Sequence, residues 1–470
     1  YNMTYINNYK ALNPLGTVLL DVGDMMQGTP ISNLLYGESV IDVYNHMGYK
    51  ASVVGNHEFD WGLDVLQDRM DQAKFPILLA NVFYEGSDER PDWAVPTTML
   101  YVKGEHIGVI GVTSKDTPSI VMAGVTEGLE FRDVGPIVEE LAEDLRDQGA
   151  TMVIVLAHMP DVYGSVVSGE MTQVAVPGVD LILSGHSHSG YTGKVNGIPI
   201  IQQYSSGTAI GVSNLRSDRL TDSVINSSLQ VVTTYNQGVT PDPTIASLVA
   251  NYQAEIAPIV NAVKASTTGP ISRGPDRYTM EVPMGDLIAD AQAWKGGTQI
   301  AFMNPGGIRA DIAYATYPHD ITYGDFLTVQ PFDNKLVTMT LTGNQIYALL
   351  EQQFAPPQSS MKLLQESGLH YHYNLSLPVG SRITELYLTD GTPILHDDTL
   401  YTVTCNEFIA TGGDNFSVFL SGTNVTRIGV SDLDALIEYV QFLYGIPPDN
   451  TPIDPTVYPK DEDRIVNDTP

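Results

Sequence analysis

Roughly the first half of the chain alternates short apolar runs with amphipathic stretches, and this alternation restricts the folds open to it. Apolar runs of strand length lie at residues 17–20, 51–54, 77–80, 107–110, 152–156 and 179–183. Amphipathic stretches of helical length, such as residues 136–148, lie between several of them. Buried strands separated by helices indicate a layered α/β domain, with sheets flanked by helices.

The second half of the chain follows a different pattern. After a break near residues 238–243, a helix is predicted at 244–264, long enough to bridge two domains. Beyond it, helical and strand patterns are mixed, which is typical of a smaller α+β domain. Helices are predicted at 284–294 and 342–354, and strands at 335–341 and 383–388. The tail, residues 444–470, is rich in Pro and Asp and is predicted to be irregular.

The length of the chain also favours more than one domain, because a single hydrophobic core rarely serves 470 residues. We expect the layered domain at residues 1–235 and a bridging helix or linker at 236–265. The smaller α+β domain is then expected at residues 266–470.

The charge of the chain restricts its partners. It has 55 acidic and 23 basic residues and a net charge of −32, which disfavours nucleic-acid polymers and anionic membranes. No apolar stretch approaches the roughly 18 residues that a membrane span needs. The same charge repels phosphate, so any site for a small phosphate-bearing molecule needs local positive charge from metal ions or arginines.

Cys405 is the only cysteine, so the chain can form no internal disulfide and no cysteine-based metal site. It lies in an alternating strand pattern at residues 401–405, which indicates a buried structural thiol. Any metal site is therefore expected to use carboxylate, amide and imidazole groups.

Polar side chains follow four of the predicted strands in the first domain. They are Asp24, Asn56, His57, His158, His186 and His188, and they include four of the ten histidines. In open α/β sheets, ligands bind beyond the carboxyl ends of the strands. A lone histidine after a strand is more often structural than a ligand, but four such turns in order favour a functional site.

The chemistry of this set indicates a metal centre. Carboxylate, amide oxygen and imidazole without thiolate suit Mn, Fe, Co or Zn. Two such cations, about 3.5–4 Å apart, clamp both the attacking and the leaving oxygen of a phosphoryl displacement. Gly23, Gly55 and Gly185 are expected to let the backbone turn sharply into the centre.

A second polar constellation lies in the C-terminal half. Residues 302–309 place two glycines and Arg309 after a short apolar run, a pattern suited to close backbone approach and bidentate anion binding. Phe332 and Phe408 each lie beside turn residues. A pair of rings suits stacking on both faces of a base, although an isolated phenylalanine is more often part of a core.

The blocks Gly23-Asp24, Gly55-Asn56-His57-Glu58, Ala157-His158 and Gly185-His186-Ser187-His188 resemble those of calcineurin-like metallophosphoesterases. The longer forms at residues 23–30 and 55–62 resemble the 5′-nucleotidase branch, and the match covers nearly the whole chain. The resemblance implies a metallophosphoesterase domain followed by a C-terminal substrate-binding domain. In this family the substrate domain rotates to carry its ligand to the metals.

The resemblance implies roles for the residues of the first constellation. Asp24 is similar to the carboxylate that bridges two metals. Asn56, His158 and His186 are similar to ligands of one metal, and His188 to a ligand of the other. His57 resembles the catalytic imidazole that stabilises the transition state, and Asp60 its orienting partner.

The C-terminal segments resemble the family's nucleotide-binding domain. By that resemblance Phe332 and Phe408 sandwich the base, while Asn334 and Asp414 contact the nucleoside. Arg309 holds phosphate or carboxylate, with Asn304 nearby. Arg277 stands one residue away from the spacing of a further family arginine.

The chain departs from the family pattern at its beginning. The family begins with an Asp-x-His block that binds the first metal, and no histidine precedes Asp24 here. The expected explanation is an upstream segment that is missing from the chain; the alternative is natural loss of one metal. We therefore expect two divalent ions (Zn, Mn, Co or Fe) in the complete protein and one tightly held ion in this chain.

The predicted function is metal-dependent hydrolysis of a nucleoside 5′-monophosphate to nucleoside and phosphate. Alternatives are a 2′,3′-cyclic phosphodiesterase or 3′-nucleotidase, a nucleotide-sugar pyrophosphatase, and a catalytically impaired nucleotide-binding protein. The family resemblance implies a secreted protein, in an extracellular, periplasmic or cell-surface location. Six Asn-x-Ser/Thr sequons are compatible with secretion.

Overall fold

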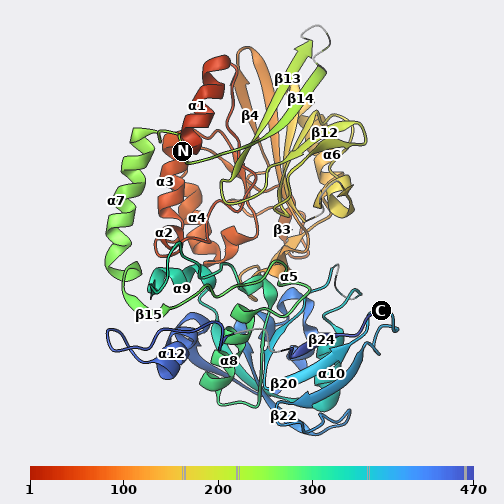
Figure 1. The fold of residues 1–470 in the computed structure, drawn as a ribbon. Helices are drawn as coiled ribbons and strands as arrows, with labels where there is room; N and C mark the ends of the chain where they lie inside the picture. Colours follow the sequence, from red (N-terminus) through yellow and green to blue (C-terminus); the bar gives the residue numbers. More distant parts are fainter. Residues whose placement is uncertain are drawn as a thin grey trace. The chain divides into compact units, whose positions relative to one another are not determined.

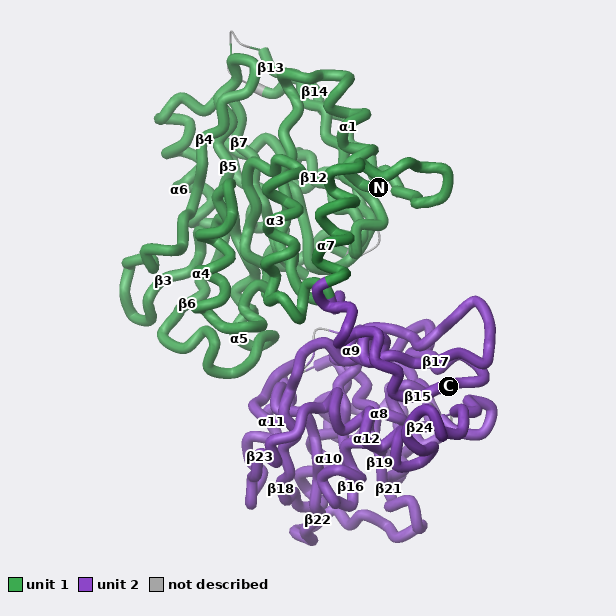
Figure 2. Tube along the Cα trace, turned by 90° about the vertical axis from the view of Figure 1, so that its left-hand side faces the viewer, with its two compact units in different colours: residues 1–27, 31–254 green, residues 28–30, 255–470 purple. Residues whose placement is uncertain are grey.

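The computed structural model describes the chain except for residues 161, 164–165, 219–220, 222, 357, 359 and 460–462. The chain divides into two compact units, shown in different colours in Figure 2. Unit 1 comprises residues 1–27 and 31–254, and unit 2 comprises residues 28–30 and 255–470. Helix α7 (Pro243–Val260), in the segment predicted to bridge two domains, spans the boundary. Both units combine sheets with helices, which confirms the predicted α/β class.

The main sheet of unit 1 has the strand order β11-β12-β10-β7-β5-β4. Its strands β4 and β12 are labelled in Figure 1. Strands β5, β7, β10 and β12 are parallel to their neighbours within this group, whereas the edge strands β4 and β11 are antiparallel. The strands are β4 (Thr97–Val102), β5 (Glu105–Thr113), β7 (Met152–Met159), β10 (Leu181–His186), β11 (Tyr191–Val195) and β12 (Ile198–Gln202). The carboxyl ends of the parallel strands therefore lie at one edge of this sheet.

Both faces of this sheet are buried, as the apolar runs predict. On one face, Val138 of helix α6 (Val134–Asp147) and Val155 of β7 belong to the same buried apolar cluster. On the other face lies the parallel pair β1 (Ser52–Val53) and β2 (Ile77–Leu78), and Val53 shares a second buried cluster with Ile154 of β7. Neighbouring residues of β7 thus serve opposite layers, because side chains alternate along a strand.

The remaining elements of unit 1 surround these layers. They are α1 (Asn2–Leu12), α2 (Pro30–Asn33), α3 (Glu38–Met47), α4 (Gly62–Gln72), α5 (Thr117–Ile120), β3 (Val82–Tyr84), β6 (Leu129–Phe131), β8 (Val162–Tyr163), β9 (Val166–Val167), β13 (Ala209–Asp218) and β14 (Ser223–Thr233). One predicted strand is wrong: residues 17–20 form only an isolated bridge between Leu20 and Ala51. That bridge still sets the segment leading to Asp24 beside β1.

Unit 2 contains a five-stranded mixed sheet in the order β19-β16-β22-β18-β23. Strand β16 is parallel to β22, and the other pairs are antiparallel. The strands are β16 (Ile300–Met303), β18 (Lys335–Thr342), β19 (Gln365–Ser367), β22 (Leu400–Asn406) and β23 (Thr423–Ser431). Cys405 is fully buried in β22, within the hydrophobic cluster of this unit.

Helices and two smaller sheets complete unit 2. They are α8 (Pro283–Gly296), α9 (Tyr323–Val329), α10 (Gly343–Glu351), α11 (Glu407–Ala410), α12 (Asp432–Tyr444), β15 (Val263–Thr267), β17 (His319–Thr322), β20 (Leu369–Tyr373), β21 (Ile383–Leu388) and β24 (Ile465–Asn467). The sequence predicts an irregular tail, yet the tail supplies β24, which pairs with β20. Tertiary pairing creates this strand from a segment of three residues with little pattern of its own.

A group of buried acids lies between α8 and the tail of unit 2. Asp286 and Glu366 are fully buried, and Glu281 is largely buried. Arg464 donates two hydrogen bonds to Asp290, at 2.9 and 3.0 Å. Burial raises the pKa of Asp286 to about 10; Arg464 opposes this shift, and Glu281 and Glu366 add to it. Asp286 is therefore protonated in the folded protein at neutral pH.

We predict that Asp286→Asn raises the melting temperature at pH 8. Unfolded Asp286 ionises near pH 4, whereas the folded group keeps its proton to about pH 10. The stability of the native chain therefore falls as pH rises between these values, and a neutral amide of the same shape avoids this loss. Calorimetry should show a gain of at least about 2 °C at pH 8 and a smaller one at pH 5. A lower melting temperature at pH 8 contradicts the prediction.

Candidate active site

Four predicted metal ligands come together in unit 1, from separate parts of the chain. His158 lies near the end of β7, and His186 ends the adjacent parallel strand β10. The Nε2 atom of His158 lies 3.1 Å from an Asp24 carboxylate oxygen and 3.2 Å from Nδ1 of His186. That Nδ1 atom also lies 2.9 Å from the amide oxygen of Asn56. Two imidazoles, a carboxylate and an amide oxygen therefore meet at one point.

The orientation of His158 suits a metal ligand. Its Nδ1 atom lies 2.7 Å from the backbone carbonyl of Val22, to which it donates. A backbone acceptor for one ring nitrogen turns the other toward the centre and fixes the ring. The donor set suits a divalent ion of the Mn, Fe, Co or Zn type, and Asp24, His158 and His186 offer ligand atoms within 4.8 Å of one another. The residues present therefore fit a divalent metal.

Electrostatics inside the cluster agree with this fit. Burial lowers the pKa of His158, but the Asp24 carboxylate outweighs it and raises that pKa to about 9. Burial, together with the charge of His158, lowers the pKa of His186 to about 3. One imidazole is cationic and the other neutral beside a carboxylate, so a divalent cation bound by these atoms would replace the proton on His158.

Glu58 holds the two loops that carry Asp24 and Asn56. Its buried carboxylate accepts hydrogen bonds from the backbone N–H groups of Asp24 (2.8 Å), Met25 (2.8 Å), Met26 (3.3 Å) and Gly55 (2.6 Å). Asp24 has a positive φ of 53°, a conformation that persists only when its surroundings hold it. Glu58 belongs to one of the sequence motifs, but the sequence alone assigns it no role, because its hydrogen-bond partners lie up to 34 residues away.

Gly23 and Gly55, two of the three glycines expected to turn the backbone into the site, are needed for different reasons. Gly23 has a φ of +84°, as the predicted sharp turn requires. Gly55 is needed for space instead: a Cβ atom there would lie 2.4 Å from an Asp24 carboxylate oxygen. The close approach of the two loops thus depends on the missing side chain of Gly55.

His57 and Asp60 form a hydrogen-bonded pair next to the cluster. Nδ1 of His57 lies 2.9 Å from a carboxylate oxygen of Asp60, and both side chains are largely buried. The backbone N–H of His57 donates to Asp24 at 3.0 Å. The pair leaves Nε2 of His57 as the ring atom turned away from Asp60.

His188 is the fifth predicted metal ligand. It is exposed and has a φ of 55°, and its charge contributes to lowering the pKa of His186. Among the residues that the structure describes, the group of three potential ligands contains Asp24, His158 and His186 but not His188. The structure thus assembles one side of the predicted pair of metal sites.

In unit 2, the strand register brings the predicted substrate residues to one edge of the mixed sheet. Phe302 of β16 pairs with Cys405 of β22, and Leu336 of β18 pairs with Asn406. Asn304, Phe332 and Phe408 all lie just beyond these pairs, at the same end of three neighbouring strands. Both phenylalanine rings are half-buried, and Phe408 packs partly on the core.

Two side chains donate hydrogen bonds to the Asp414 carboxylate at this edge. One carboxylate oxygen accepts from Asn304 at 3.0 Å, and the other accepts from Lys362 at 2.6 Å. Asn334 is buried, and its side chain hydrogen-bonds the buried Asp432 carboxylate. The sequence did not single out Lys362.

Three arginines surround the turn formed by residues 304–307. Arg277 donates to the carbonyl of Pro305 at 2.6 Å, and Arg309 lies with its guanidinium carbon 5.6 Å from the Phe332 ring centre. Arg273, which the sequence did not single out, donates to the carbonyl of Arg309 at 2.9 Å. Burial lowers the pKa of Arg277, and the charges of Arg273 and Arg309 add to this.

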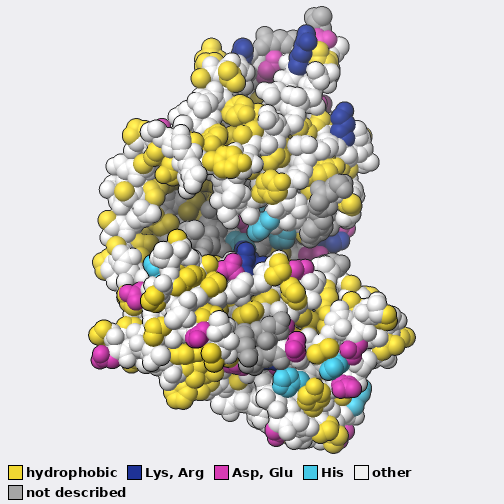
Figure 3. All heavy atoms as spheres, in the orientation of Figure 1, with side chains coloured by type: hydrophobic (Ala, Val, Ile, Leu, Met, Phe, Trp, Pro, Cys, Tyr) yellow, Lys and Arg dark blue, Asp and Glu magenta, His cyan; other side chains and the backbone are white. Residues whose placement is uncertain are grey.

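Positive charge is sparse in this chain. The chain has 23 basic residues, and lysine and arginine side chains are few and separate on the face drawn in Figure 3. Three guanidinium groups near one another repel, and an anion between them relieves that repulsion. The turn at residues 304–307 is therefore a candidate anion site.

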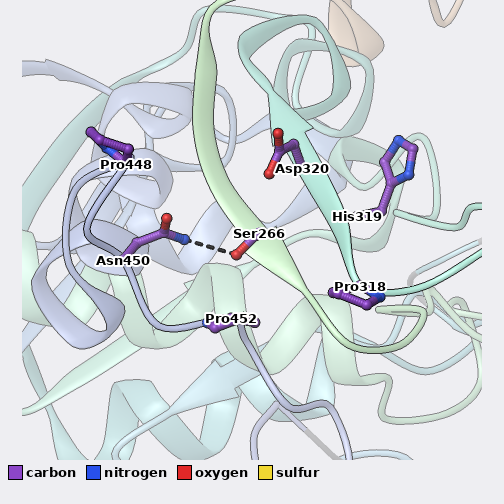
Figure 4. A pocket seen from close by; sticks show the side chains of 7 residues that line it. All are labelled: Ser266, Pro318, His319, Asp320, Pro448, Asn450 and Pro452. Atoms are coloured by element: carbon purple, nitrogen blue, oxygen red, sulfur yellow. Dashed lines mark hydrogen bonds between the residues drawn. The ribbon is translucent and has the colours of Figure 1, made fainter.

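A separate hollow of about 500 Å³ lies elsewhere in unit 2 (Figure 4). It is lined by Ser266, Pro318, His319, Asp320, Pro448, Asn450 and Pro452. The side chain of Asn450 donates to Ser266 across it at 2.9 Å. None of these residues belongs to the predicted site.

Family models match both parts of the chain. Residues 4–190 match the calcineurin-like phosphoesterase model, and residues 262–421 match that of the 5′-nucleotidase C-terminal domain. Unit 1 is thus a calcineurin-like phosphoesterase domain. With the second match, the chain belongs to the 5′-nucleotidase family, as its motifs predict.

Two curated relatives match the chain over most of its length. The chain is 30% identical to endonuclease YhcR of Bacillus subtilis over 465 residues, 94% of this chain and 37% of that protein. It is 28% identical to the cell wall protein Lmo0130 of Listeria monocytogenes over 488 residues, 93% of this chain and 62% of that protein. The chain therefore spans less than two thirds of either relative.

A solved structure covers both units. The 5′-nucleotidase precursor from Thermus thermophilus is similar with a TM-score of 0.83 and 26% identity. The match covers 99% of this chain and 92% of that one. In the described part of the chain, no helix has both the length and the apolarity to cross a membrane.

We predict that Glu58→Gln weakens metal binding. The new amide group presents N–H donors to backbone N–H donors, so the loops of Asp24 and Asn56 separate. Calorimetric titration with Mn²⁺ or Zn²⁺ should show affinity reduced by roughly 10–100-fold, and elemental analysis of the unchanged chain should find one tightly held ion.

Asp180→Asn is the matched control for this experiment. It removes a largely buried acid that accepts from the backbone N–H of Val153, at the start of β7, away from the ligand end of that strand. Its metal affinity should stay unchanged. A folded Glu58→Gln protein with affinity within about threefold of the original would show that the loops do not depend on this carboxylate.

Proposed function

We propose that the chain hydrolyses a nucleoside 5′-monophosphate to nucleoside and phosphate in a metal-dependent reaction. The observation that carries this proposal is the convergence of Asp24, Asn56, His158 and His186 within a calcineurin-like phosphoesterase domain. The aromatic and arginine residues around the turn at 304–307 support a nucleotide as substrate.

Asp24, Asn56, His158 and His186 would hold one divalent ion, and Asp24 and His188 would contribute to a second. Such ions supply Lewis acidity toward a phosphoryl oxygen and toward water. We propose one tightly held ion in this chain, because the ligands on that side are assembled.

His57 acts beside the phosphate. The Asp60 carboxylate accepts from Nδ1 of His57 at 2.9 Å, which fixes the ring and stabilises its protonated form. Nε2 of His57 then donates to a phosphoryl oxygen or to the leaving oxygen as negative charge develops there. Burial of both side chains keeps water away from this pair and strengthens its electrostatic effect.

Unit 2 recognises the nucleotide. Phe332 and Phe408 stack on the base, which selects a π-face and tolerates both purines and pyrimidines. Asp414 and Asn334 contact the nucleoside, and Asn304 donates to Asp414 beside them. Arg309, Arg277 and Arg273 hold an anionic group of the substrate by charge-assisted hydrogen bonds.

The same proposal places the protein outside the cytoplasm, in an extracellular, periplasmic or cell-surface location. Its relative Lmo0130 is a cell wall protein. The six sequons in the sequence are compatible with secretion.

Phosphate release from AMP in the presence of Mn²⁺ or Zn²⁺ tests the proposal. We expect turnover that EDTA abolishes, with AMP preferred to 3′-AMP, 2′,3′-cyclic AMP and ADP-ribose, because those substrates represent the alternative activities. Preference for one of the latter would reassign the substrate. AMP binding without turnover would make the chain a binding protein.

His57→Ala is the catalytic control in the same assay. It should lower turnover by roughly 10²–10⁴-fold and leave the metal content unchanged, because His57 is not a ligand. A loss of less than about threefold, or loss of the ion, would remove His57 from the proposed role.

We predict that Phe408→Ala raises KM for AMP by roughly tenfold or more, because stacking contributes about 1–3 kcal/mol per base. Turnover of p-nitrophenyl phosphate, which has no base, should stay nearly unchanged. Phe442→Ala is the matched control, since Phe442 is 65% exposed on α12 in the same unit. Equal losses on both substrates with a lower melting temperature would show that Phe408 is only part of the core.

A further inference from the structure

Lys362 forms an ion pair inside the nucleoside-binding part of unit 2. Its ammonium donates to Asp414 at 2.6 Å, and the two side chains are only 16% and 13% exposed. The main chain of this segment is fixed as well, because the N–H of Lys362 donates to the carbonyl of Gln353 at 2.9 Å. The next residue, Leu363, donates to the carbonyl of Tyr278 at 2.9 Å. Lys362 is therefore a held side chain and not a mobile surface lysine.

Asp414 is held by hydrogen bonds besides that from Lys362. Asn304 donates to its second carboxylate oxygen at 3.0 Å, and Gln358 donates to its backbone carbonyl at 2.7 Å. Asn406 donates to the amide oxygen of Asn304 at 2.9 Å, so Asn304 must turn its amino group toward Asp414. Asp414 itself has a φ of 55° and a ψ of 24°, a left-handed conformation that needs such support.

The carboxylate keeps acceptor capacity for a ligand. Each ionised carboxylate oxygen has about two acceptor positions, and within this group one on each oxygen is used by Lys362 or Asn304. The vicinal hydroxyls of a ribose present two donors, which suit the two oxygens of a fixed carboxylate. A site built to accept from a hydroxyl strongly disfavours an analogue without it.

Charge gives Lys362 a second effect. An anionic nucleotide approaching Asp414 meets a carboxylate in a chain of net charge −32, and like charges in a partly buried site repel strongly. Lys362 offsets the charge of Asp414 at its own position. The carboxylate then serves as a hydroxyl acceptor without repelling the substrate.

We propose that Lys362 is a specificity-determining residue, which sets the preference for ribonucleosides by holding Asp414 as a fixed, charge-balanced acceptor for the ribose hydroxyls. This inference rests on the proposed function, in which Asp414 contacts the nucleoside. Lys362 acts through Asp414 and is therefore a positioning residue.

Binding of adenosine and of 2′,3′-dideoxyadenosine, measured by calorimetry, tests this inference without any turnover. The unchanged chain should bind adenosine at least about tenfold more tightly than the dideoxy analogue. Lys362→Met should weaken adenosine about tenfold and the analogue little, so the preference is lost. Lys362→Arg should keep most of the preference, because a guanidinium also pairs with a carboxylate.

The double variant Lys362→Met with Asp414→Asn separates positioning from packing. If Lys362 acts through Asp414, the double variant should bind adenosine as Asp414→Asn alone does. Lys362→Met alone leaves the buried Asp414 carboxylate without its ion pair and could unfold the chain. The double variant has no carboxylate at position 414, so it can still be measured in that case. Lys295→Met, which breaks the ion pair with Glu438 on α12, is the matched control and should leave both affinities unchanged.

Two outcomes overturn the inference. One is an equal loss of affinity for both nucleosides in Lys362→Met, and the other is additive losses in the double variant. A chain that binds adenosine with this preference but does not hydrolyse AMP would contradict the proposed hydrolase and leave the role of Lys362 intact. In contrast, AMP hydrolysis without a ribose preference would retain the hydrolase and remove the role of Lys362.

Discussion

The candidate metal site of unit 1 is assembled around the buried carboxylate of Glu58. Four backbone N–H groups from two loops donate to it, so neither loop can move without leaving buried donors unsatisfied. Asp24 has a positive φ, and the absence of a side chain at Gly55 leaves the space that the Asp24 carboxylate needs. The ligands on β7 and β10 then meet loops that are already in position, which is the condition for a preorganised metal site.

Sheet geometry supplies the other half of that centre. His158 and His186 lie at the carboxyl ends of neighbouring parallel strands, and both faces of the sheet are covered by apolar layers. Parallel strands bring their carboxyl ends to a single edge, and ligands collect there because the backbone turns away from the core. A rigid sheet therefore fixes the imidazoles, while the loops fix the carboxylate and the amide.

In unit 2, charged side chains are grouped and neutralised locally. A chain with a large acidic excess gathers Arg273, Arg277 and Arg309 around one turn and balances Asp414 with Lys362. Elsewhere in the unit, the buried Asp286 keeps its proton. Local neutralisation thus permits acidic groups inside the fold and leaves positive charge at the turn where an anionic ligand would bind.

The sequence by itself determined the α/β class, the family and the residues that meet at the candidate metal site, because strand periodicity and the residues after each strand are local properties of the chain. Tertiary structure alone decided which side chains pair over long distances. It gave Glu58 its four donors, paired Lys362 with Asp414, added Arg273 to the other arginines and turned Asn334 toward Asp432. It also left only an isolated bridge where a strand was predicted at residues 17–20, and it formed strand β24 in the tail by pairing it with β20. Such contacts depend on how distant segments pack, and packing leaves no periodic signal in either segment.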